Sequence, residues 1–200
     1  MKKIIILGCG GHANSCIEII EQLSNFKIYG FICKSKKNIT SKYKVLGDDS
    51  SIKQIAKKCK NAFIGIGQIK SFKLRFKIFK LLKKEGFKLP KIISKTSYVS
   101  KYTLIGEGSI IMNKVFVNRN VLVGSNTIIN TGAIIEHDTK IGSNCHISTG
   151  TIINGGVTIG DGTFIGSGSV VNENIKIGKN CIISSQSRIK KNLKANLIIK

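Results

Sequence analysis

The 200-residue sequence has no tryptophan, one proline, three histidines and only ten acidic residues, against 33 lysines and arginines. The resulting formal charge of +23 is typical of chains that bind nucleic acids or anionic membranes. However, only three of these cations are arginine, and aromatic residues make up 6% of the chain, so side chains that read bases or stack on them are scarce. We therefore expect no nucleic-acid partner, and a basic binding module remains an alternative.

Long apolar runs are also missing. The run Ile4–Leu7 follows two lysines, as in a signal peptide, but it ends at Gly8 and fits a buried strand better. No stretch approaches the length of a membrane span, so no stable membrane insertion is expected. The six cysteines form no CxxC pair and no cluster with histidine, which predicts reduced thiols, no metal and a cytoplasmic location. A hydrophobic content of 42% excludes a disordered basic tail.

The most informative feature present is a six-residue repeat. Stepping by six from Val99 to Ile189 gives sixteen positions, and every one is Val or Ile. A period of six suits neither a helix nor a plain strand, but three such repeats can close a triangular coil of short strands. We expect the aliphatic residues to point inward, beside the small or β-branched residues two places earlier. The residue directly after them is often glycine or asparagine, which we expect to supply the unusual φ at each corner.

Residues 1–90 follow a different pattern. The predicted strands are Ile4–Leu7, Lys27–Cys33 and Ala62–Ile66, and the predicted helices are Ala13–Leu23, Ser51–Cys59 and Phe72–Lys84, the last ending at Gly86. This alternation predicts a small parallel sheet covered by helices. The only proline, Pro90, stands where the pattern stops. We therefore expect a Rossmann-like α/β domain over residues 1–90 and a parallel β-helix over residues 91–200.

A glycine-rich loop, Gly8–His12, joins the first predicted strand to the first helix. Backbone N–H groups in such a loop, together with the helix dipole, can receive a phosphate. A dinucleotide site also needs an acidic residue at the end of the second strand, where this chain has Cys33-Lys34. A nicotinamide-dependent dehydrogenase is therefore disfavoured. Binding of some other nucleotide and a tight turn without a ligand both remain open.

Two of the histidines fall within the repeat. His137 lies between Glu136 and Asp138, and the inward positions are already taken by the aliphatic series, so its side chain is expected to point outward. There it could act as a general base near neutral pH, and a solvated surface histidine is the alternative. His146 follows nine residues later, and no third ligand is in register, so zinc is not expected.

Together, the Gly8–Ala13 turn, the strand Phe63–Gly67, the unbroken repeats and the segment Asn130–Asp138 followed by His146 resemble the left-handed β-helix acyltransferases. The similarity covers nearly the whole chain. It is greatest to the branch that contains the sialic acid O-acetyltransferases and the nucleotide amino-sugar N-acetyltransferases. The resemblance implies a left-handed coil and a homotrimer, with acetyl-CoA in the groove between neighbouring prisms.

The resemblance also implies roles for single residues. His137 would take a proton from the attacking amine or hydroxyl, and Asp138 would orient it. His146 would contact the thioester end of the cofactor, with Ser167 and Ser185 farther along the groove. These two serines are separated by one full coil of three repeats and are expected on one face.

For the substrate, the resemblance implies that Gly10, Gly11, His12 and Gly67 hold the nucleotide part of the sugar. Two departures from the family are visible: Cys33-Lys34 replaces an Asp pair, and a Pro-Ala-Lys segment that helps cover CoA is missing before the end of the sequence. The expected activity is N-acetylation of a UDP- or GDP-linked amino-deoxy sugar in surface-glycan biosynthesis. The alternatives are a sialic acid O-acetyltransferase and a catalytically inactive hexapeptide-repeat protein.

Overall fold

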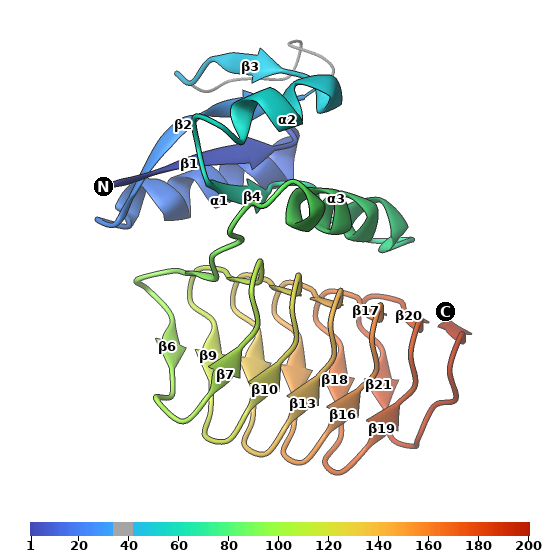
Figure 1. The fold of residues 1–200 in the computed structure, drawn as a ribbon. Helices are drawn as coiled ribbons and strands as arrows, with labels where there is room; N and C mark the ends of the chain where they lie inside the picture. The colour runs from blue at the N-terminus through green and yellow to red at the C-terminus, as the bar shows by residue number, and fades with distance from the viewer. Residues whose placement is uncertain (34–41) are drawn as a thin grey trace. The chain divides into compact units, whose positions relative to one another are not determined.

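The computed structural model describes residues 1–33 and 42–200, and Figure 1 shows the course of the chain. These residues form two compact units. The first contains Met1–Gly67 and Lys73–Ile92, and the second contains Gln68–Phe72 and Ile93–Lys200. The segment Gln68–Phe72 thus belongs with the repeats, which the order of elements along the chain does not indicate.

The first unit is a parallel α/β layer, as the sequence predicts. Its elements are β1 (Lys2–Leu7), α1 (Gly11–Gln22), β2 (Phe26–Ile32), β3 (Val45–Gly47), the 3₁₀ turn η1 (Asp49–Ser51), α2 (Ile52–Ile55), β4 (Asn61–Ile64) and α3 (Lys73–Lys84). The strand order is β3-β2-β1-β4, and every pairing is parallel. A parallel sheet of this kind needs cover on both faces, which explains the near-continuous apolar sequences of β1 and β4.

One element of this unit was missed and one expectation was wrong. The strand β3 was not predicted, because three residues are too few to show an alternating pattern. The helix predicted at Ser51–Cys59 is α-helical only over Ile52–Ile55. Beyond it, the N–H groups of Lys57 and Lys58 donate to carbonyls three residues back, so the chain tightens into a 3₁₀-like turn.

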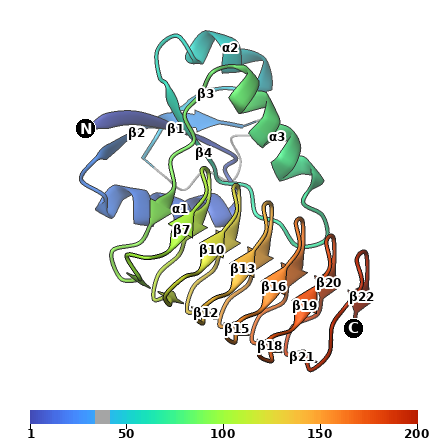
Figure 2. The ribbon, with the colours of Figure 1, turned by 60° about the horizontal axis from the view of Figure 1, so that its bottom comes forward.

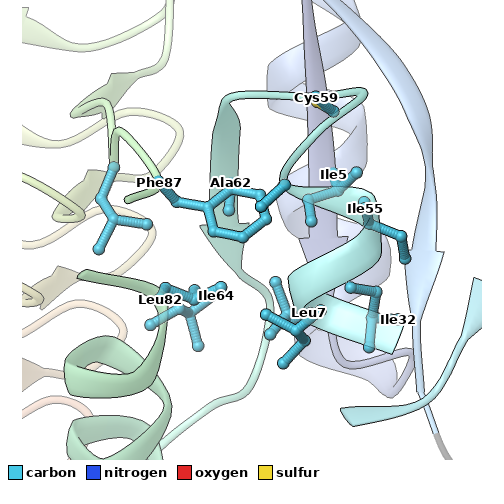
Figure 3. Close-up of a cluster of buried hydrophobic side chains, with 12 residues drawn as sticks. Ile5, Leu7, Ile32, Ile55, Cys59, Ala62, Ile64, Leu82 and Phe87 are labelled. Atoms are coloured by element: carbon cyan, nitrogen blue, oxygen red, sulfur yellow. The ribbon is translucent and has the colours of Figure 1, made fainter. Parts of the chain in front are cut away.

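Side chains from β1, β2, α2 and β4 converge in one apolar cluster, which is drawn in Figure 3 with Leu82 and Phe87. Leu82 comes from the last turn of α3. Gly86 ends this helix with φ +78°, and the N–H of Phe87 then donates to the carbonyl of Leu82 at 3.0 Å. The predicted glycine cap therefore turns the chain so that Phe87 enters the core.

The second unit is a left-handed parallel β-helix, a three-sided prism of two-residue strands (Figures 1 and 2). The β14 face holds β5 (Ile92–Ile93), β8 (Ile110–Ile111), β11 (Ile128–Ile129), β14 (His146–Ile147), β17 (Phe164–Ile165), β20 (Ile182–Ile183) and β22 (Ile198–Ile199). The β12 face holds β6 (Tyr98–Val99), β9 (Phe116–Val117), β12 (Ile134–Ile135), β15 (Ile152–Ile153), β18 (Val170–Val171) and β21 (Arg188–Ile189). The β13 face holds β7 (Leu104–Ile105), β10 (Leu122–Val123), β13 (Lys140–Ile141), β16 (Thr158–Ile159) and β19 (Lys176–Ile177).

The aliphatic series fills the prism. Pairs such as Ile129 with Ile147 are in register across one coil, which confirms three six-residue repeats per coil. From Ile111 to Ile189 every position of the series is buried, and only Val99 and Ile105, in the first coil, are half-buried. Full burial of such a side chain contributes roughly 1.5–3 kcal/mol, so this regular interior stabilises the unit strongly.

The expectation for the prism corners was only partly right. The positive φ angles occur three residues after the aliphatic residue, for example at Asn126, Asp138 and Gly150, rather than directly after it. Glycine directly after the aliphatic residue has a different cause. At Gly124, an added Cβ would lie 2.5 Å from the backbone nitrogen of Ser143 in the next coil. These glycines therefore permit close stacking of the coils.

Candidate active site

His137 and Asp138 form a close pair at the edge where the β12 face meets the β13 face. Nδ1 of His137 lies 2.8 Å from Oδ2 of Asp138, and φ of Asp138 is +59°. An ionised carboxylate can only accept a hydrogen bond, so Nδ1 carries the proton and donates it to Asp138. In the neutral ring, Nε2 is then the nitrogen with a lone pair. This is the arrangement that a general base requires.

The coil before His137 holds Asp138 in place. Oδ1 of Asp138 accepts a hydrogen bond from Nδ2 of Asn120 at 3.1 Å, and the Asp138 N–H donates to the Arg119 carbonyl at 3.1 Å. The hydrogen bond from His137, followed by that from Asn120, lowers the pKa of Asp138 below its ordinary value. The carboxylate is therefore ionised at neutral pH and fixed in direction. Asn120 was missed in the sequence, although its position exactly one coil before Asp138 is a signal that could have identified it.

A glycine in the coil after His137 leaves room for the imidazole ring. A Cβ added at Gly155 would lie 2.7 Å from Cε1 and 2.8 Å from Nε2 of His137, so the imidazole lies directly over this glycine. The His137 side chain is nevertheless 61% exposed and points outward, as the filled interior predicts. Gly155 stands one coil after His137, and sequence reasoning did not identify it.

A pocket of about 460 Å³ lies on the β14 face and along the edge that this face shares with the β12 face. Its lining residues are Ile69, Asn130, His146, Ser148, Phe164, Ser167, Ile182, Ile183, Ser184 and Ser185. The structure thus brings His146, Ser167 and Ser185 to one pocket, and its volume lies within the usual range for small-molecule sites. The hydroxyls of Ser148 and Ser167 are hydrogen-bonded to each other at 2.8 Å.

His146 is buried in this pocket, with both ring nitrogens engaged. Nδ1 is hydrogen-bonded to the carbonyl oxygen of Gln68, and Nε2 lies 3.1 Å from Nδ2 of Asn130. A carbonyl only accepts, so Nδ1 carries the proton and Nε2 accepts from Asn130. Phe164 makes a T-shaped contact with the ring, with the centroids 5.3 Å apart. Gln68 is itself held by a 2.6 Å bond from Nε2 to the carbonyl of Asn144, and no sequence pattern pointed to it.

The structure does not bring His137 and this pocket together within one chain. His137 lies at the edge between the β12 and β13 faces, whereas the pocket covers the β14 face and its edge with the β12 face. In a three-sided prism, the whole β12 face separates these two positions. A base and a cofactor pocket on one chain therefore cannot form a single reaction centre by themselves.

In the first unit, the glycine loop forms the N-terminus of α1. Gly10 is the N-cap of α1, with φ −87°, no side chain of the described residues caps the helix, and its first turn contains no acidic residue. A Cβ added at Gly10 or Gly11 would meet nothing within 4 Å. Among the described residues, neither backbone strain nor packing therefore requires glycine here, and the N-terminus of a helix favours a bound anion. Ala13 packs against Gly65, which fits the tight helix–strand contact expected of the third fingerprint position.

The other predicted substrate residues lie beside this loop. A Cβ at Gly67 would be 3.5 Å from Cβ of His12, so the two residues adjoin, and Nε2 of His12 lies 3.5 Å from Sγ of Cys16. A pocket of about 260 Å³ opens at the carboxyl ends of β1, β2 and β4. Its lining is Leu7, Gly8, Cys9, Ile32, Cys33, Asp49, Ile66, Leu74 and Ile78. Lys34, singled out in the sequence, lies outside the described residues.

Within residues 1–33 and 42–200, no three His, Cys, Asp or Glu side chains gather in a way that could hold a metal ion. Nor is any helix among these residues both long and apolar enough to cross a membrane. All six cysteines of the chain are thiols, and four of them are buried.

Comparison with protein families matches the PglD N-terminal domain over residues 3–82 and the bacterial transferase hexapeptide (six repeats) over residues 138–173 and 156–191. No relative is found among curated proteins by sequence.

Among solved structures, the chain is similar to PerB from Caulobacter crescentus in complex with CoA and GDP-perosamine. The TM-score is 0.91 and the identity is 27%, and the match covers 99% of this chain and 93% of that one. A variant of perosamine N-acetyltransferase from the same organism has a TM-score of 0.90 and 26% identity, with the same coverage. The acetyltransferase domain of PglB from Neisseria gonorrhoeae, with acetyl coenzyme A, shares the fold with a TM-score of 0.92 and 23% identity, over 98% of this chain and 95% of that one.

Proposed function

We propose that the chain is a hexapeptide-repeat sugar acetyltransferase, which transfers the acetyl group of acetyl-CoA to the amino group of a nucleotide-linked amino-deoxy sugar. The observation that carries this proposal is the outward-facing His137, whose Nδ1–H is held by Asp138 and whose Nε2 is left as a base. Similarity over almost the full chain to an enzyme solved with CoA and GDP-perosamine supports the substrate class. We place the reaction in the cytoplasm, where its product would serve surface-glycan biosynthesis.

In this mechanism, the sugar amine attacks the carbonyl carbon of the thioester. Nε2 of His137 accepts the proton that the nitrogen loses as the new C–N bond forms, and the C–S bond then breaks to release CoA. Asp138 stabilises the imidazolium and keeps the ring in the correct tautomer. The proton on Nε2 can then pass to the departing thiolate, which returns His137 to its starting form.

The pocket on the β14 face would hold acetyl-CoA. Ser167 and Ser185 lie along one face of it, and His146 and Asn130 lie at one end. Nδ2 of Asn130 donates one N–H to His146 and has a second, which could donate to the thioester carbonyl. In this arrangement, the neutral His146 orients Asn130, and Gln68 orients His146.

The separation of His137 from this pocket supports a homotrimer. With three prisms side by side, the His137 edge of one copy could face the β14-face pocket of its neighbour. Each reaction centre would then combine the base of one chain with the cofactor site of another. Size-exclusion chromatography with light scattering tests this proposal directly, and a monomer with full activity would refute it.

In the first unit, the phosphates of the nucleotide sugar would bind at the N-terminus of α1, near Gly10, Gly11, His12 and Gly67. The helix dipole favours an anion at this position, and the lysine excess of the chain would attract both substrates.

The test is to incubate the protein with acetyl-CoA and a panel of UDP- and GDP-linked amino sugars while following thiol release. We expect turnover on at least one amino sugar, and a loss of roughly 10²–10⁴-fold in kcat in His137→Ala. No turnover above the His137→Ala background on any amine would refute the proposal. Acetylation of sialic acid hydroxyls alone would replace it with O-acetylation.

A further inference from the structure

We propose that the carboxylate of Asp49, just after β3, recognises the ribose hydroxyls of the bound nucleotide. This inference rests on the proposed function and identifies a residue that determines specificity for the nucleotide. In parallel α/β nucleotide sites, an acidic residue at the end of the second strand commonly performs this task. In this chain, the second strand ends with Ile32, and a half-buried cysteine, Cys33, follows.

The sheet topology brings another acidic residue to this position. β3 pairs in parallel with β2, so both strands end at the same edge of the sheet. The N–H of Cys33 donates to the carbonyl of Gly47 at 3.0 Å. The residues that follow Gly47 therefore leave the sheet beside Cys33. They are Asp48 and Asp49.

The side chains of these two acids have different surroundings. Oδ1 of Asp48 accepts from the N–H of Ser50 at 2.9 Å and from its hydroxyl at 2.6 Å, so Asp48 caps the η1 turn. Gly47 has φ +149°, and a Cβ there would lie 2.2 Å from Oγ of Ser51, so only glycine lets the turn fold back this closely. Asp49, the first residue of that turn, is exposed and lines the 260 Å³ pocket.

The pocket fits part of a nucleotide. Its walls are mostly apolar, with Leu7, Ile32 and Ile66 among them, and Asp49 is the one acidic residue among the described residues that line it. It is slightly smaller than a complete small-molecule site, which suits a nucleoside whose phosphates lie outside it. Gly8 and Cys9 line the pocket and lead directly to Gly10, the N-cap of α1. A nucleoside here would therefore have its phosphates near that helix end and its ribose near Asp49.

The experiment measures nucleotide binding by calorimetry, with UDP and GDP compared with their 2′-deoxy forms. A hydrogen bond from a ribose hydroxyl to a carboxylate is worth roughly a ten- to hundredfold change in Kd. The wild-type protein should prefer the ribose form by about this factor. Asp49→Asn should bind the ribose form more weakly and lose most of the preference. Glu18→Gln removes one negative charge from an exposed site on α1, and it should retain the full preference.

A rescue variant separates a ribose contact from a general effect on folding. Asp49→Asn combined with Cys33→Asp places the acid at the end of β2, and we expect it to regain at least part of the preference for ribose. Melting temperatures report whether each variant is folded. A wild-type protein that binds both sugar forms equally, or an Asp49→Asn variant that keeps the preference, would overturn the inference.

The two proposals fail in different ways. If wild-type protein releases thiol with an amino-sugar substrate but Asp49→Asn leaves the KM for that substrate unchanged, only the Asp49 inference is wrong. If the ribose preference depends on Asp49 but no amino sugar is acetylated, only the proposed function is wrong. If the wild-type protein binds no nucleotide at all, both are wrong.

Discussion

Substitution of Gly155 by alanine tests the catalytic arrangement without changing His137 or Asp138. Gly155 has no positive φ, so alanine is compatible with its backbone. The new methyl group would lie 2.7 Å from Cε1 and 2.8 Å from Nε2 of His137, whereas ordinary contact begins near 3.4 Å. The imidazole must therefore move outward by about 0.7 Å.

This displacement is large for a proton transfer. A misplacement of about 1 Å can cost roughly 10²-fold in rate, so we expect kcat to fall about 10- to 100-fold. The shift also strains the 2.8 Å bond to Asp138, which sets the tautomer of the ring. Because the atoms that must yield belong to an exposed side chain, the melting temperature should change little. The KM for acetyl-CoA should also stay near its wild-type value, because the added methyl group contacts the imidazole and replaces none of the residues that line the β14-face pocket.

The assay is steady-state thiol release, with Gly124→Ala as the matched control. An added Cβ at Gly124 meets backbone atoms of the next coil at 2.5–2.6 Å, so this variant should lose stability and have no direct effect on His137. The double variant Gly155→Ala/His137→Ala should be no slower than His137→Ala, because the glycine acts only through the ring. A Gly155→Ala enzyme with wild-type kcat would refute the assignment of His137 as the base.

Three further predictions concern the His137–Asp138 pair, the interior of the prism and the buried cysteine thiols. Asp138→Asn should lower kcat at neutral pH at least 10-fold. It should also be less stable than wild type in urea at neutral pH. Because the folded-state pKa of Asp138 is lowered, this stability difference should be present above about pH 4 and should disappear as the pH falls further through the folded-state value. Ile147→Ala removes a fully buried side chain and should cost about 2–5 kcal/mol in the free energy of unfolding, measured in urea. Burial raises the pKa of Cys16 and Cys145 to about 12, so in the folded protein at pH 8 both should resist a thiol reagent that labels Cys9 and Cys33, as read by mass spectrometry.

The prism could be predicted from the sequence because one physical demand recurs at every coil. An inward side chain such as Ile129 must fill the same space as Ile147 one coil later, so the requirement repeats in the sequence. The corners were harder to predict, since glycine serves two purposes there. At Gly150 it adopts a positive φ, whereas at Gly124 it avoids the backbone of the next coil. Composition alone does not separate these two causes.

The α/β unit was less predictable where its elements are short. β3 has three residues, and its place in the sheet depends on pairing with β2, which is a tertiary contact. The contact between Gln68 and His146 joins residues 78 positions apart, and no periodicity connects them. Conversely, the Gly8–His12 loop was found readily, because its glycines, the preceding strand and the following helix are adjacent in sequence.

The residues that support His137 differ from both of these cases. The sequence encodes them through their spacing from the functional residues, and this signal is easily overlooked. The aliphatic series uses the inward positions of every coil, so functional side chains can stand only at the edges, where each one contacts the equivalent residues of the coils before and after it. Asn120 supports Asp138 from one side, and Gly155 accommodates His137 from the other. A functional edge residue in this fold therefore constrains its neighbours at a fixed spacing. The same reasoning extends to Asn118, whose Nδ2 donates to Oε2 of Glu136 at 2.6 Å and so holds the residue that precedes His137.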